Sequence, residues 1–240
     1  IVLRISRRAQ ALLYFLALEK KTHSRTYLAS LFWPDLSDQH ARKNLRNIVP
    51  ELRTLLGDYF IIESDSISLK ADGSYWLDVD EVRQTFEPSL HLLELQNVPP
   101  SAKTISTEKV LRGAKLYTGE FLLGFFIPDA PFYEEWVATH REYHHHLVVS
   151  KLSAFAMQAF EQDEHKLAAT ITRHLIRIDP LNEAGHRLQM RLLALDGQRS
   201  YALAYYERIK QQLFKELEVE PDLETQTLAQ EIRDGHLPSQ

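Results

Sequence analysis

The chain has 240 residues, of which 44% are hydrophobic and 25% charged, and it contains no cysteine. This composition excludes a wholly disordered chain, a disulfide framework and a thiolate metal site. No apolar run approaches the roughly 18–20 residues that span a bilayer, and no secretory leader is recognisable, so we expect a cytoplasmic protein with no membrane partner. The first residues, Ile1-Val2-Leu3, resemble the end of a strand, which indicates a piece of a longer chain whose N-terminal strands are incomplete and which has flanking domains.

The charge is unevenly distributed along the chain. The net charge is −5, but residues 1–57 carry ten Lys and Arg against four Asp and Glu, a net +6, whereas residues 58–240 carry a net −11. Phosphate contact requires a local excess of cations, because each neutralised phosphate releases condensed counterions. The basic segment is therefore a candidate nucleic-acid interface, and an ordinary solvated surface is the alternative.

Two helices are predicted in the first part of this basic segment. Ser6 is a suitable N-cap for the first helix, whose apolar residues recur every three or four positions over 9–17. Ser24 can cap a short second helix, which ends before Pro34 because proline disfavours the helical conformation of the preceding residue.

A third, longer helix is predicted from Ser37 or Asp38 to Gly57, a natural left-handed stop. At about 100° per residue its core face consists of Ala41, Leu45, Ile48, Val49, Leu52, Leu55 and Leu56. The opposite arc consists of Lys43, Arg46, Asn47, Pro50 and Thr54, flanked by Arg42 and Arg53. Because a proline costs about 3 kcal/mol in a helix interior, we expect a kink or a helical restart at Pro50.

A hairpin is predicted after the third helix. Residues 60–63 and 67–70 flank a turn at Ser64-Asp65-Ser66, and apolar residues alternate in the second run. Residues 75–79 can add a further strand. Three helices followed by a hairpin predict a winged helix-turn-helix, whose third helix enters the DNA major groove.

The rest of the chain has a helical pattern. Helices are predicted over residues 80–95, 107–117 and 132–161, with breaks at Pro99-Pro100 and over 119–124. Residues 166–180 and 200–221 then resemble each other, and Ala168 and Ala202 are separated by the tetratricopeptide period. The expected fold is mostly α: a winged helix-turn-helix domain over residues 1–79 and a helical, tetratricopeptide-like domain over residues 80–240.

Several motifs along the chain occur together in one known family. In the first part they are Leu31-Phe32-Trp33-Pro34-Asp35, Ala41-Arg42-Lys43-Asn44-Leu45-Arg46, Leu52-Arg53 and Trp76-Leu77-Asp78-Val79-Asp80. In the second part they are Leu116-Tyr117-Thr118-Gly119-Glu120-Phe121-Leu122, Gly124-Phe125, Glu134-Glu135-Trp136-Val137, Ile178-Asp179-Pro180 and Glu216-Leu217-Glu218-Val219-Glu220-Pro221. With these motifs the chain resembles the bacterial transcriptional activator domain family, in which a response-regulator-type winged helix precedes a tetratricopeptide-like domain, as in antibiotic-pathway regulatory proteins. The resemblance implies sequence-specific binding to double-stranded DNA, often at promoter repeats, and contact with RNA polymerase.

The outward arc of the third helix supplies the candidate base-reading residues. Arg46 and Lys43 suit the guanine acceptors and Asn47 suits adenine. The alternative is an exposed helix face without a ligand. The resemblance supports DNA contact by the first half of this helix better than by its second half, because of Pro50.

Further basic side chains are candidates for phosphate contact. Arg42, Arg53, Arg25 and Ser24 are placed for it, since the start of the second helix also offers free amides. Lys70 and Ser66 could bring the wing to the DNA backbone, although Glu63 and Asp65 oppose this contact.

Other side chains favour structural roles. His140, His144, His145 and His146 invite a metal site, but no third ligand is evident and we favour a solvated helix face. The chain has no phosphate-binding glycine loop and no catalytic triad spacing, so we predict neither a cofactor nor enzymatic activity. Five aromatic residues are expected to pack the winged helix against the helical domain, or else to anchor a partner: Phe121, Phe125, Phe126, Phe132 and Trp136.

The sequence therefore favours a DNA-binding transcriptional regulator, an activator that contacts RNA polymerase. The alternative is a protein-interaction module of a larger signalling protein, in which the winged helix no longer binds DNA.

Overall fold

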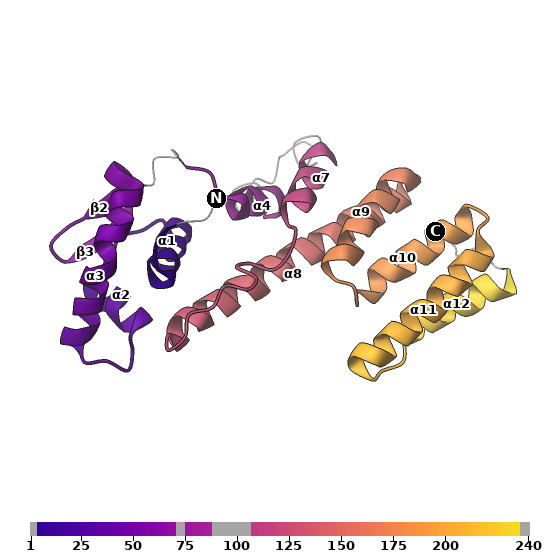
Figure 1. The fold of residues 1–240 in the computed structure, drawn as a ribbon. Coiled ribbons are helices and arrows are strands. Elements are labelled where there is room, and N and C mark those ends of the chain that lie inside the picture. The colour runs from indigo at the N-terminus through magenta and orange to yellow at the C-terminus, as the bar shows by residue number, and fades with distance from the viewer. Residues whose placement is uncertain (1–3, 71–74, 88–106, 236–240) are drawn as a thin grey trace, which may run out of the picture. The chain divides into compact units, whose positions relative to one another are not determined.

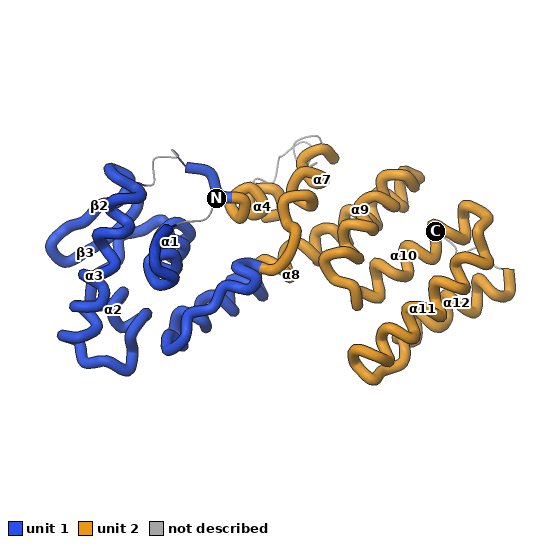
Figure 2. The backbone as a smooth tube through the Cα atoms, viewed as in Figure 1, with its two compact units in different colours: residues 1–77, 121–143 blue, residues 78–120, 144–240 orange. Residues whose placement is uncertain are grey.

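The computed structural model describes residues 4–70, 75–87 and 107–235 (Figure 1). The chain forms two compact units, which Figure 2 colours separately: unit 1 comprises residues 1–77 and 121–143, and unit 2 comprises residues 78–120 and 144–240. Two features predicted from the sequence, the strand end at residues 1–3 and the Pro99-Pro100 break, lie outside the described residues.

Unit 1 contains the three helices and the hairpin that the sequence predicts. The helices are α1 (Arg7–Glu19), α2 (Arg25–Phe32) and α3 (Asp38–Leu56), followed by the short turn η1 (Gly57–Tyr59). The strands are β1 (His23–Ser24), β2 (Phe60–Ile62) and β3 (Ser66–Leu69), which form an antiparallel sheet in the order β1-β3-β2. The winged helix-turn-helix is thus confirmed. The strand β1 was not predicted; in it His23 pairs with Ile67.

The predicted helix ends are present at α1, α2 and α3. The Ser6 hydroxyl accepts a hydrogen bond from the Ala9 amide (3.3 Å), and the Ser24 hydroxyl accepts one from the Tyr27 amide (3.1 Å). Gly57 ends α3 with a φ of +55°, a backbone conformation that disfavours residues with a side chain. The two serine caps satisfy amides that would otherwise lack a partner at the helix starts, whereas Ser37 precedes α3 without a side-chain capping bond.

The core of unit 1 uses the predicted apolar face of α3. Ala41, Leu45, Ile48, Val49 and Leu52 are buried together with residues of α1, α2 and the sheet. The prediction for Leu55 is wrong, because its side chain is 42% exposed. Leu55 lies about 60° around the helix from Leu52, at the edge of the apolar arc.

The helix α8 (Pro131–Glu161) contributes its first residues to unit 1. Tyr133 and Val137 belong to the same core as the winged helix, together with Ile127 and Ala130 from the preceding loop. Phe121, Phe125 and Trp136 pack against this core, as predicted for contacts with the winged helix. For Phe126 and Phe132 that prediction is wrong, since both side chains are exposed.

Unit 2 is helical throughout its described elements. These are α4 (Asp78–Phe86), α7 (Thr107–Leu116), the second part of α8, α9 (His165–Ile178), α10 (Glu183–Leu195), α11 (Arg199–Leu217) and α12 (Leu223–Asp234). The strand predicted over 75–79 is wrong. Asp78 instead begins α4, whose first turn holds three acidic residues that interact favourably with the helix N-terminus. The helix predicted over 80–95 is present as α4 as far as Phe86, and residues 88–95 of that prediction lie outside the described residues.

The predicted repeat corresponds to two helix pairs, α9 with α10 and α11 with α12. Ala168 and Ala202 are fully buried within these pairs, as expected for small residues at a close helix contact. α11 has 19 residues and α9 has 14, so the first helix of the second pair is the longer one. The mostly α fold class is confirmed. In the described part of the chain, no helix is both long and apolar enough to cross a membrane.

Candidate nucleic-acid interface

The outer face of α3 presents Lys43, Arg46 and Asn47, which we call the cationic ridge. All three side chains are exposed, and none makes a hydrogen bond or ion pair with another described residue. The ridge is on the opposite side of α3 from the buried residues Ala41, Leu45 and Leu52, because the apolar positions recur with the period of the helix. Its cations and its amide are therefore available to a ligand.

The helix α3 continues through Pro50 as one element, so the predicted restart does not occur. Pro50 is exposed, and the Thr54 hydroxyl donates a hydrogen bond to its carbonyl oxygen (2.9 Å). Because Pro50 lacks an amide proton, it cannot donate to the carbonyl of Arg46. Arg53 lies beyond Pro50 in the last turn and is also exposed.

Arg42 links α3 to the start of α2. Its Nη2 atom lies 2.6 Å from the Thr26 hydroxyl oxygen and 3.3 Å from an Asp38 carboxylate oxygen. The guanidinium is therefore held at one place by both helices. Because a guanidinium carries five N–H groups, some of them remain available to a ligand after these two contacts are made.

The start of α2 is joined to the wing. Nε and Nη2 of Arg25 donate to the backbone carbonyl oxygen of Glu63 (3.2 and 3.0 Å). The backbone amide of Arg25 donates to the backbone carbonyl oxygen of Asp65 (2.9 Å). Ser24 uses its hydroxyl oxygen to cap α2. These bonds fix the distance between the wing turn and the N-terminus of α2.

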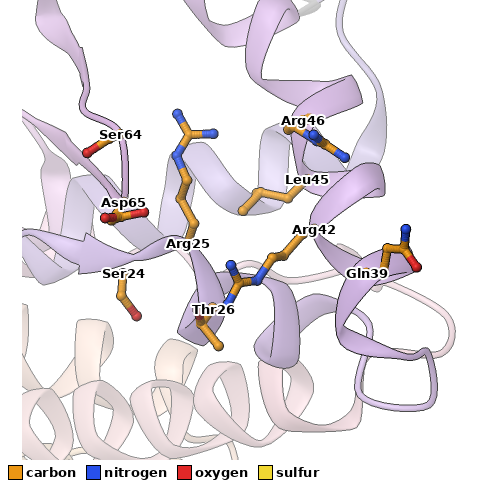
Figure 3. Close-up of a pocket in the computed structure, with 9 residues that line it drawn as sticks. All are labelled: Ser24, Arg25, Thr26, Gln39, Arg42, Leu45, Arg46, Ser64 and Asp65. Atoms are coloured by element: carbon orange, nitrogen blue, oxygen red, sulfur yellow. Dashed lines mark hydrogen bonds between the residues drawn. The ribbon is translucent and has the colours of Figure 1, made fainter.

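Together these elements enclose a groove of about 510 Å³ (Figure 3). Its lining residues are Ser24, Arg25, Thr26, Gln39, Arg42, Leu45, Arg46, Ser64 and Asp65. Three guanidinium groups in one groove favour an anionic ligand, since guanidinium pairs well with phosphate oxygens. Asp65 is the opposing charge in the lining, and the sequence had already indicated that it opposes backbone contact by the wing.

The groove brings together only part of the predicted site. It contains Ser24, Arg25, Arg42 and Arg46, whereas Lys43, Asn47, Arg53 and Lys70 do not line it. Lys70 lies at the end of the hairpin, with its Nζ 6.0 Å from the centre of the Tyr59 ring. The predicted residues thus fall into three places: the groove, an adjoining exposed face of α3, and the end of the hairpin, where Lys70 lies.

Among the polar residues of the groove, sequence reasoning did not name Thr26, Gln39 and Ser64 as candidate site residues. Gln39 had a usable signal, because extending the helical projection of α3 by one turn towards its start places it between Arg46 and Lys43. Thr26 had none, since its contact with Arg42 depends on how α2 packs against α3.

The histidines of α8 do not converge on a metal site. His140 Nε2 lies 3.9 Å from a Glu19 carboxylate oxygen. The solvated helix face predicted for these histidines is wrong for His144, whose side chain is buried. Within the described residues, no three His, Asp or Glu side chains are grouped so that they could hold a metal ion.

A family model described as the bacterial transcriptional activator domain matches residues 101–233, which is more than half of the chain. Among solved structures, the chain is similar to Mycobacterium tuberculosis EmbR in complex with a low-affinity phosphopeptide, with 17% sequence identity and a TM-score of 0.60. The alignment covers 98% of this chain and 61% of that chain, and at this identity it shows a shared fold. No curated protein sequence matches the chain.

Proposed function

Since the chain belongs to the bacterial transcriptional activator domain family and is therefore a regulator of transcription, we propose that it acts by binding specific DNA sequences through α3. The observation that carries this proposal is the cationic ridge, whose three side chains are exposed and unpaired among the described residues. The surrounding charge supports it, because residues 1–57 carry a net +6 in a chain whose net charge is −5.

The side chains divide into two roles by their chemistry. Arg46 and Lys43 would donate to guanine O6 and N7, and Asn47 would pair with adenine in the major groove. Arg25, Arg42 and the Ser24 end of α2 would hold phosphates in the groove, since all three residues line it. Arg53 and Lys70 would contact phosphates further along the DNA backbone.

The proposal is tested by selecting bound duplexes from a random pool and footprinting the selected sites. We expect an enriched sequence, arranged as promoter repeats. On that sequence Arg46→Ala weakens binding by about 1–3 kcal/mol, or roughly 5- to 150-fold in Kd. Arg173→Ala, which removes an exposed arginine from α9, is the matched control and leaves Kd unchanged. A pool that yields no enrichment at moderate salt would overturn the proposal.

We further propose that the regulator activates transcription by contacting RNA polymerase through unit 2. Between α10 and α11, a groove of about 350 Å³ is lined by Gln189, Leu193, Gln198, Tyr201, Ala204, Tyr205 and Arg208. Tyr201 is 71% exposed, and the Arg208 guanidinium lies 4.7 Å from the centre of the Tyr205 ring. Exposed tyrosine and arginine are the side chains that most often supply binding energy at protein interfaces.

Activation is tested with purified polymerase and a promoter that carries the selected site. We expect Tyr201→Ala and Arg208→Ala to lower transcript yield while Kd for DNA stays unchanged. Phe214→Ala, an exposed aromatic residue of α11 outside the groove, is the control. Normal transcript yield from both groove variants would place the polymerase contact elsewhere.

A second candidate function is a protein-interaction module whose winged helix no longer binds DNA. Asp65 in the α2–α3 groove and the net −11 of residues 58–240 favour this alternative, because both repel phosphate. This alternative requires that the chain still binds a protein partner when Lys43→Glu and Arg46→Glu are combined. Loss of DNA binding by the same double variant would instead support the DNA-binding function.

A further inference from the structure

Gln39 lies at the start of α3, directly beside the cationic ridge. It is the second residue of the helix, its side chain is exposed, and it lines the groove together with Arg42 and Arg46 (Figure 3). An inference about its role rests on the proposed function, because it concerns how α3 distinguishes one DNA sequence from another.

Gln39 differs from the residues on either side of it in having an available polar group. The Asp38 carboxylate pairs with Arg42 (3.3 Å), and His40 Nδ1 lies 2.7 Å from the Ser37 hydroxyl oxygen. The Gln39 amide makes no hydrogen bond with another described residue. Of these three first-turn side chains, only Gln39 therefore keeps both its donor and its acceptor for a ligand.

The geometry of an α-helix aligns Gln39 with Arg46. Arg46 is seven residues after Gln39, and at about 100° per residue this is about 20° short of two full turns. The two side chains therefore leave the helix in nearly the same direction. Lys43 is about 40° away from Gln39 on the same face. At about 1.5 Å per residue, Gln39 and Arg46 are separated by roughly 10 Å along the helix axis.

The chemistry of the side chain matches a base edge more fully than a phosphate. A glutamine amide can donate and accept at the same time, which matches N7 and N6–H of adenine, whereas a phosphate oxygen only accepts. The first residues of a recognition helix are also those that reach base edges in helix-turn-helix proteins.

We propose that Gln39 reads an adenine–thymine pair, about three base pairs from the pair read by Arg46. The spacing takes α3 to lie along the major groove, so that the roughly 10 Å between the two side chains spans about three steps of 3.4 Å between successive bases. Gln39 thereby sets sequence preference at one end of the contacted site, and Arg46 sets it further along.

The test compares the sequences selected by the wild-type chain and by Gln39→Ala, Gln39→Glu and Arg46→Ala. In Gln39→Ala, discrimination for adenine at one position falls by about 5- to 150-fold, while the preference at the Arg46 position is unchanged. In Gln39→Glu, which retains only acceptors, the preference at that position shifts towards cytosine. Gln211→Ala, an exposed glutamine of α11, selects the wild-type sequence.

Two results would overturn the assignment. If Gln39→Ala binds all sequences more weakly by the same factor, Gln39 contacts a phosphate and does not read a base. If both Gln39 variants select the same sequence as the wild type, Gln39 has no role in sequence recognition. Arg46→Ala separates this failure from that of the proposed function. If Arg46→Ala alters the selected sequence and the Gln39 variants do not, DNA recognition stands and the inference fails; if the wild type selects nothing, both fail.

Discussion

At the scale of a single residue, His186 shows how burial fixes a protonation state. Its side chain is buried, with Nε2 2.9 Å from the Pro180 carbonyl oxygen and Nδ1 2.7 Å from the Tyr205 hydroxyl oxygen. Because a carbonyl oxygen only accepts, Nε2 carries the proton and Nδ1 accepts from Tyr205. Burial lowers the pKa of His186 from its ordinary 6.5 and Arg208 adds to the effect, whereas the hydrogen bond to Pro180 opposes it.

This lowered pKa makes stability depend on pH. The unfolded chain takes up a proton near pH 6.5 that the folded chain resists, so stability is complete above that pH and declines as the pH falls below it. Burial lowers the pKa values of His23 and His174 in the same sense. We expect the urea midpoint to be lower at about pH 5.5 than at about pH 7.5.

The variant His186→Gln isolates the contribution of this residue. Its urea midpoint changes less with pH over the same range than that of the wild type, whereas the exposed His146→Gln retains the full dependence. An equal pH dependence in His186→Gln and the wild type would contradict the assignment.

At the scale of the elements, Gly113 determines how closely α4 and α7 approach. A Cβ atom at this position would lie 2.8 Å from Thr85 Cγ2 and 2.9 Å from Phe86 Cε2. Thr85 and Phe86 are buried, so neither side chain has free space into which it could move. The helix contact therefore depends on the missing side chain.

In Gly113→Ala, overpacking lowers the free energy of unfolding by about 1–3 kcal/mol. The higher helix propensity of alanine offsets roughly 1 kcal/mol of this loss, so we expect a net destabilisation. Urea denaturation measures the change. Combining it with Thr85→Ser removes the nearer contact while keeping the hydroxyl that donates to the Glu81 carbonyl, so part of the loss is recovered. A stabilised Gly113→Ala variant would show that the helices can separate without cost.

A second contact between elements joins α8 to α1. Trp136 Nε1 donates a hydrogen bond to a Glu19 carboxylate oxygen (2.9 Å), and the Trp136 ring packs 5.0 Å from that of Phe15. Burial opposes ionisation of Glu19, but hydrogen bonds from Lys21 and Trp136 hold its pKa below the ordinary value. The carboxylate is therefore charged when it accepts the hydrogen bond from the indole N–H.

Replacing Trp136 by phenylalanine removes the donor and keeps an aromatic ring. We expect a loss of about 1.5–3 kcal/mol in the free energy of unfolding, because the lost bond goes to a charged acceptor. A double-mutant cycle with Glu19→Ala, which removes the acceptor, checks the pair, and two losses that simply add would mean that the bond contributes nothing.

The elements also show which features the sequence could predict. The caps at Ser6 and Ser24 and the period of α3 are local, so α1, α2, α3 and the exposure of Lys43, Arg46 and Asn47 followed from them. The strand β1 has only two residues and exists through its pairing with β3, which no local pattern indicates.

The long-range contacts of the site were equally inaccessible. The bonds of Arg25 to the Glu63 carbonyl and of Arg42 to Thr26 form only when α2, α3 and the wing pack together. Likewise, the periodicity of α8 predicted a helix, but only the fold shows that Tyr133 and Val137 complete the core of unit 1.

At the scale of the whole molecule, the separation of charge bears on the proposed binding to DNA. On that proposal the cations of residues 1–57 would attract the duplex, and the net −11 of the remaining chain would repel it. Binding should then depend on the exposed cations around α3 and weaken steeply as salt rises, since each phosphate contact releases counterions.

The salt dependence gives a count of phosphate contacts. The logarithm of the association constant falls linearly with the logarithm of salt concentration, with a slope of about −0.9 for each contact. Arg53→Ala removes an exposed cation of α3, so we expect weaker binding to every sequence and a slope shallower by about one. Arg173→Ala in α9 removes the same charge from unit 2 and leaves the slope unchanged. Equal slopes for the wild type and Arg53→Ala, measured by titration at several salt concentrations, would show that Arg53 does not reach the DNA backbone.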